Sequence, residues 1–65
     1  MSDGDYIAHA LLGSYADRKD LERAVETGAR GVIKAVVRRL IGKRFPGFLW
    51  AVDIVVNIVC DYFGW

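Results

Sequence analysis

Three polar residues, Asp53, Asn57 and Asp61, recur every four positions in the otherwise apolar stretch 48–65. Two carboxylates can act together as general acid and base when they lie close enough to share a proton or a substrate. On a helix, however, Asp53 and Asp61 stand two turns apart, about 12 Å along the axis at 1.5 Å per residue. The spacing therefore predicts a narrow polar stripe on one helix face and argues against a catalytic carboxylate pair.

The remaining chemically versatile side chains are one histidine, His9, and one cysteine, Cys60. A structural zinc site takes four ligands, mostly from Cys and His, so we predict neither a metal site nor a cofactor. Cys60 lies among apolar neighbours and is interpreted as a small buried hydrophobe. Because no base or electropositive setting is visible around it in the sequence, a nucleophilic thiol is not expected. The sequence therefore predicts no catalytic residue and no enzyme.

A third feature is the basic segment 30–44, which carries six cationic side chains and no acid. The segment has a charge of +6 and the rest of the chain −5, which gives the net charge of +1. The basic segment therefore produces a strong local positive field although the net charge is small. Its polar face lacks amide and aromatic side chains that could read or stack on bases, which favours lipid headgroups over nucleic acid. The predicted anion-binding residues are Arg30, Lys34, Arg38, Arg39, Lys43 and Arg44.

The elements that must position these residues are four helices, with no strands. Ser2 with Asp5 has the pattern of a capping box and predicts a first helix to about Leu12. Ser14 with Asp17 repeats the pattern and predicts a second helix, which ends at 27–28 with a glycine.

The third helix is predicted from about Ala29 to Gly42, because its apolar residues follow the helical period. Its apolar face consists of Ile33, Val36, Val37, Leu40 and Ile41. Pro46 suits a first helical turn, and a fourth helix is predicted over Pro46–Trp65. The short connections favour one domain, residues 1–65, folded as a compact all-α four-helix bundle. A chain of 65 residues buries only about 60% of its unfolded surface, so self-association as a homo-oligomer is an open source of stability.

The predicted fourth helix has a composition that fits either a bundle core or lipid. Aromatic residues at its end are typical of the interface between lipid and water. Each carboxylate, however, would cost about 2.5–3.5 kcal/mol near the bilayer centre, which disfavours a solitary span. We therefore hypothesise that Asp53, Asn57 and Asp61 meet part of the basic face in the folded protein, and that replacing the two aspartates by Asn lowers thermal stability.

The stretch AVETGARGVIKAVVRRLIGKRFPGF, residues 24–48, resembles the central part of circular bacteriocins of the enterocin and gassericin type. The resemblance lies in Val25-x-x-Gly28, in an aliphatic helix that closes on Gly42, and in a turn with Pro46 before another hydrophobic helix. It implies a saposin-like bundle that binds membranes through the six basic residues named above, with Trp50 and Trp65 as interfacial aromatics. The acids, the free cysteine and the two glycines near the joined ends depart from that family, so the interpretation includes a linear or leaderless relative.

The resemblance and the residues together lead to one first interpretation and two alternatives. The first is a secreted, membrane-active antibacterial peptide, a bacteriocin that binds the anionic membrane of target bacteria and permeabilises it. Because the N-terminus is acidic and no signal peptide is visible, export would need a dedicated route or the removal of a leader that precedes this sequence. The alternatives are a small cytoplasmic helical module that binds nucleic acid or regulates, and an immunity or interaction protein.

Overall fold

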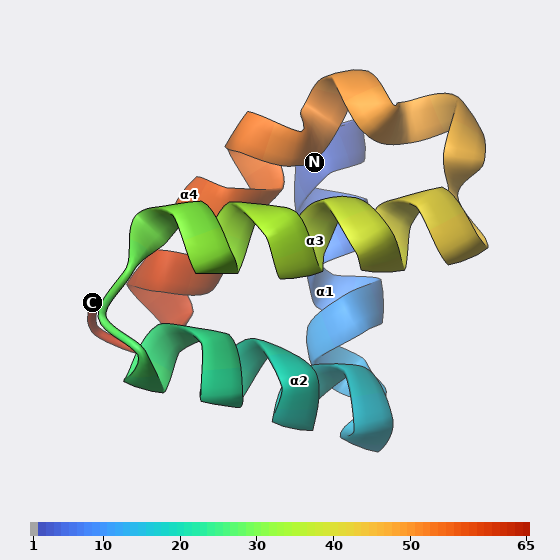
Figure 1. Ribbon diagram of the computed structural model, residues 1–65. Coiled ribbons are helices and arrows are strands. Elements are labelled where there is room, and N and C mark those ends of the chain that lie inside the picture. Colours follow the sequence, from blue (N-terminus) through green and yellow to red (C-terminus); the bar gives the residue numbers. More distant parts are fainter. Residues whose placement is uncertain (1) are drawn as a thin grey trace.

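The computed structural model describes residues 2–65, and these residues form four α-helices and one short 3-10 helix, with no strand (Figure 1). The protein is therefore an all-α four-helix bundle, as the sequence predicts. The elements are α1 (Asp3–Gly13), α2 (Tyr15–Glu26), α3 (Arg30–Arg44), the 3-10 helix η1 (Pro46–Ala51) and α4 (Val52–Tyr62).

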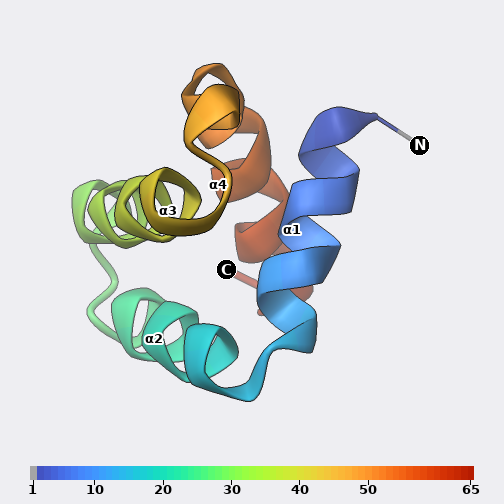
Figure 2. The same cartoon turned by 90° about the vertical axis from the view of Figure 1, so that its right-hand side faces the viewer.

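The helices pack in a closed order, in which each contacts the next in the chain and α1 contacts α4. In Figure 2, α4 lies between α1 and α3, while α2 runs beneath α3. Every α-helix contributes to one hydrophobic core, whose largest fully buried side chains are Ile7, Leu11, Leu21, Ile33, Val37, Ile41, Val55, Val56 and Val59. The core thus holds α3 in place as the platform for most of the basic side chains.

The start of α1 has the capping box that the sequence predicts. The Ser2 hydroxyl accepts a hydrogen bond from the Asp5 backbone N–H at 3.2 Å, and the Asp5 carboxylate accepts one from the Ser2 backbone N–H at 3.2 Å. The Ser2 hydroxyl also donates to that carboxylate at 2.9 Å, and this bond, with the backbone bond, lowers the pKa of Asp5. The reciprocal bonds satisfy donors that the first helical turn leaves without partners.

The second predicted capping box is wrong. The Ser14 side chain makes no capping hydrogen bond at the start of α2, although Ser14 does precede the helix. Asp17 is 5% exposed and its carboxylate lies 3.0 Å from the Arg44 guanidinium. The carboxylate that the sequence pattern assigned to the cap therefore lies beside the positive charge of Arg44, at the end of α3.

Two predicted helix boundaries also differ from the structure. The helix α3 does not end at Gly42 but continues to Arg44, and Phe45 follows as its C-cap. The predicted helix over Pro46–Trp65 is not continuous: η1 contains a non-helical residue, Phe48 (φ −115°, ψ 22°), and α4 begins only at Val52. Pro46 does stand in the first turn of a helix, as predicted, but that helix is the short η1; Gly47 is a poor α-helix former, and Phe48 packs against the core.

The close approach of α1 to α4 depends on a glycine. A Cβ atom on Gly4 would stand 3.1 Å from the Ile54 Cβ and nearer still to its Cγ2. Because Ile54 is β-branched, its side chain cannot swing away from such a contact without leaving its rotamer. Gly4 therefore allows the first turn of α1 to rest directly on the first turn of α4.

Candidate anion-binding surface

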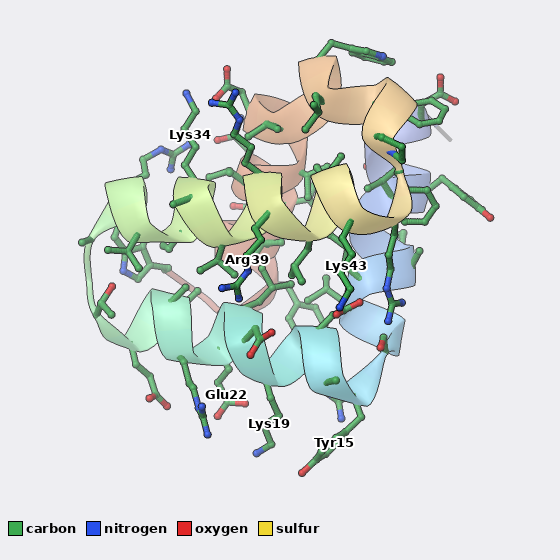
Figure 3. All side chains as sticks on the ribbon, turned by 45° about the vertical axis from the view of Figure 1, so that its right-hand side comes forward. Tyr15, Lys19, Glu22, Lys34, Arg39 and Lys43 are labelled. Carbon is green, nitrogen blue, oxygen red and sulfur yellow. The ribbon has the colours of Figure 1, made fainter. Side chains whose placement is uncertain are left out.

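The basic side chains of α3 divide between two neighbouring helices. Figure 3 shows Lys34 on one side of α3, while Arg39 and Lys43 point to the other side, where α2 lies. The six predicted anion-binding residues therefore do not form one continuous surface. Four of them contact polar side chains of α4 or α2, and these contacts decide how much positive charge remains for a ligand.

On the α4 side, the predicted pairing of the polar stripe with the basic face is present at two of its three residues. The Lys34 ammonium lies 3.2 Å from the Asp53 carboxylate, and the Arg30 guanidinium donates a hydrogen bond to the Asn57 side-chain oxygen. Both links are exposed; the Asp53 and Lys34 side chains keep 79% and 55% of their surface accessible. Exposed pairs of this kind contribute only about 0.2–1 kcal/mol, so they align α3 and α4 without locking them.

Asp61, the third residue of the stripe, is exposed and has no ion pair within residues 2–65. We therefore expect Asp53→Asn to lower the free energy of unfolding by about 0.2–1 kcal/mol, because it removes the charge opposite Lys34. Asp61→Asn serves as the matched control and should leave stability unchanged. Thermal unfolding followed by circular dichroism would check both, and an equal effect of the two variants would contradict the pairing.

On the α2 side, two further arginines form ion pairs with aspartates. The Arg39 guanidinium lies 3.7 Å from the Asp20 carboxylate, and this pair is largely exposed. The Arg44 guanidinium lies 3.0 Å from the Asp17 Oδ2, which is buried and accepts no hydrogen bond from any residue in 2–65. The orientation of the Arg44 guanidinium thus gives charge compensation but not a hydrogen bond, and Asp17 depends on that charge.

Of the six cations, Arg30 bonds only the neutral Asn57 and Cys60, and Arg38 and Lys43 have no hydrogen-bond or ion-pair partner within the described part of the chain. Both are exposed, and Arg38 lies on the outer face of α3 between the two sets of ion pairs. A ligand anion therefore competes with no protein carboxylate at Arg38, whereas it must displace Asp53 at Lys34.

Arg38 borders two hollows that meet on the outer face of α3. The first, which we call the α3 groove, has a volume of about 600 Å³ and is lined by Gly31, Lys34, Ala35, Arg38, Arg39, Gly42 and Leu49. The second has about 300 Å³ and is lined by Lys34, Arg38, Leu49, Trp50, Val52 and Asp53. The two hollows share Lys34, Arg38 and Leu49, so cationic and apolar side chains lie side by side along their common border.

The aromatic part of this surface is Trp50, which is 64% exposed, next to Leu49, which is 42% exposed. Sequence reasoning selected Trp50 but missed Leu49 and the three small residues of the groove, Gly31, Ala35 and Gly42. Their spacing along α3 is the signal that could have indicated a depression among larger side chains. Leu49 becomes part of the groove only because η1 folds back over α3.

Trp65, the second predicted interfacial aromatic, lies elsewhere. It follows the last turn of α4 and is half exposed. In both Figure 1 and Figure 2 the C-terminus lies well apart from η1, the element that carries Trp50. The structure therefore does not bring the two tryptophans into one site.

Cys60 is buried, as the sequence predicts. Its setting is nevertheless more polar than the sequence suggests, because the Arg30 guanidinium lies 3.9 Å from the Cys60 sulfur and bonds Asn57 as well. The sulfur is a weak acceptor and extends the polar contact between the start of α3 and the end of α4.

Residues 2–65 contain no helix that is both long and apolar enough to cross a membrane. Comparison of the chain with protein family models, with curated proteins and with solved structures found no match. The resemblance to circular bacteriocins therefore rests on the sequence motifs of residues 24–48.

Proposed function

We propose that this protein is a secreted, membrane-active antibacterial peptide that binds anionic membranes and permeabilises them. The observation that carries the proposal is the docking cluster, which consists of Lys34, Arg38, Leu49 and Trp50. In it, an exposed tryptophan and an exposed leucine stand beside two cations. An amphipathic aromatic ring next to cationic side chains is the arrangement that suits the boundary between lipid headgroups and acyl chains.

The contacts of α4 support a role for this helix after docking. Two of its three polar residues contact α3, through Lys34–Asp53 and Arg30–Asn57, and both links are exposed. A lipid phosphate near Lys34 competes with Asp53 for the same ammonium. In the proposed sequence of events, docking removes this link, the bundle opens, and the apolar face of η1 and α4 exchanges the protein core for lipid. Permeabilisation follows from this insertion.

Dye release from vesicles tests the proposal. The protein should release dye from phosphatidylglycerol vesicles at micromolar concentration and leave phosphatidylcholine vesicles intact, because the cations require an anionic surface. The double variant Arg38→Gln/Trp50→Ala should reduce release at least tenfold. Its matched control is Arg23→Gln/Tyr15→Ala on α2, which removes the same charge and an equally exposed aromatic ring and should leave release unchanged.

Two results would overturn the proposed function. One is a native chain that releases no dye from anionic vesicles; the other is an equal loss of release in both double variants. A salt-sensitive gel shift with duplex DNA, in the absence of dye release, would instead favour a nucleic-acid-binding module.

A further inference from the structure

The α3 groove is not required for general attraction to an anionic surface, since exposed cations alone provide that. Its shape therefore calls for an explanation of its own. The wall opposite α3 is the Leu49 side chain, and the floor is formed where α3 carries Gly31, Ala35 and Gly42. A Cβ atom on Gly42 would lie in ordinary contact with Leu49 at 3.8 Å, which shows that η1 closes over this end of the groove.

The charges around the groove are arranged asymmetrically. Arg39 lies toward α2 and is paired with Asp20. Lys34 lies toward α4 and is paired with Asp53. It also lines the second hollow. Between them Arg38 has no carboxylate partner within residues 2–65. A single anion placed between Arg38 and Lys34 would therefore meet one uncompensated charge and one held only by an exposed pair.

We infer that the α3 groove binds one anionic phospholipid molecule, with its phosphate between Lys34 and Arg38 and one acyl chain along the floor against Leu49. The volume of about 600 Å³ lies within the range of about 300–1,000 Å³ usual for small-ligand sites. The cations match the phosphate in charge, and the small and apolar residues match the chain in polarity. A nucleic acid would leave this apolar wall without a partner.

This inference rests on the proposed function and makes it more specific, because it assigns recognition of single lipid molecules to one groove. It requires affinity to depend on the headgroup and on the chain separately. Each methylene buried against the groove should raise affinity about three- to fourfold. A surface that only attracts anions would show no such dependence on chain length.

The test is a titration of the ¹⁵N-labelled full chain with short-chain phosphatidylglycerols below their critical micelle concentrations. The amide signals of Gly31 and Gly42 report on the groove, and those of Gly13 and Gly64, which lie at the ends of α1 and α4, serve as references. We expect saturable shifts at the two groove glycines and an affinity that rises with chain length. Glycerophosphate and phosphatidylcholine of the same chain length should each bind at least tenfold more weakly.

A variant that fills the groove without changing charge gives the second measurement. Ala35→Leu places a larger side chain on the floor and should weaken binding of the dihexanoyl lipid at least tenfold. Ala16→Leu, at an alanine on α2 that is also exposed, is the matched control and should bind like the native chain. Unchanged thermal unfolding of both variants would show that the loss arises in the groove rather than from misfolding.

The outcomes separate this inference from the proposed function. Vesicle leakage without saturable binding of lipid monomers would overturn the groove and leave the proposed function intact. Equal binding of glycerophosphate and phosphatidylglycerol would also overturn it, because the acyl chain would then have no site. Monomer binding at the groove without vesicle leakage would support the lipid site and overturn permeabilisation.

Discussion

Ile33→Ala is expected to lower the free energy of unfolding by about 2–5 kcal/mol, since it removes buried methyl and methylene groups from a core that cannot fully collapse around the gap. Ile33 has no exposed surface and lies where α3 faces the other helices. A domain of this length has a total stability of only about 3–10 kcal/mol. The substitution should therefore lower the melting temperature by tens of degrees or unfold the chain, as measured by circular dichroism.

Val32→Ala provides the control for this experiment, because it removes a β-branched side chain from the adjacent position of the same helix. Val32 is 41% exposed, so its replacement should change stability by no more than about 0.5 kcal/mol. Similar melting temperatures for the two variants would contradict the packing described for α3.

Arg44→Gln is expected to lower stability by about 1–3 kcal/mol, because it leaves the buried Asp17 carboxylate without the cation that compensates it. For a domain of this size the melting temperature should fall by about 4–8 °C for each kcal/mol. The double variant Asp17→Asn/Arg44→Gln should be more stable than Arg44→Gln alone, since the uncompensated charge is then absent. Urea unfolding of the native chain and the variants provides the comparison.

Two further comparisons separate the effect of the Asp17–Arg44 ion pair from other effects of removing Arg44. Arg39→Gln removes the same charge from α3, but its partner Asp20 is more exposed, so the effect should stay within about 0.5 kcal/mol. Arg44 also lies in the last turn of α3, where a cation interacts favourably with the helix dipole. This helix-dipole contribution is lost in both Arg44 variants. A higher free energy of unfolding in the double variant than in Arg44→Gln therefore reports on Asp17 alone. If the double variant is no more stable, the pairing is refuted.

The helical fold could be predicted from periodicity because the core follows it closely. Along α3, four of the five residues assigned to the apolar face are buried, and only Val36 is partly exposed. The errors arose where a distant residue decides the local structure. Asp17 has the local pattern of a capping box, but Arg44 from the end of α3 binds it instead. Phe48 interrupts the expected fourth helix because its ring packs against the core.

The candidate site could be predicted only as a list of cations together with one of its apolar residues, Trp50. The sequence shows that Arg30, Lys34, Arg38 and Arg39 belong to one helix, and the sign of the acidic stripe indicates partners for some of them. The sequence does not show which cations form ion pairs with carboxylates. Asp17 and Asp20 lie on α2, and the turn at Gly28, a glycine with left-handed backbone, sets how α2 packs against α3. The groove depends on η1 folding back, which places Leu49 beside Gly42.

The contact of Gly4 with Ile54 has a consequence for how the chain folds. It joins the first turn of the first helix to the first turn of the last one, so most of the sequence lies within the loop that this contact closes. Closing such a long loop costs more conformational entropy than packing α2 against α3, which are neighbours in sequence and can pack early. Until α4 packs, α2 is the main neighbour of α1 and the rest of the apolar face of α1 stays uncovered. The core is therefore incomplete until α4 packs, and a nascent chain that has not yet supplied α4 leaves the part of the α1 face that α4 covers open to other hydrophobic surfaces.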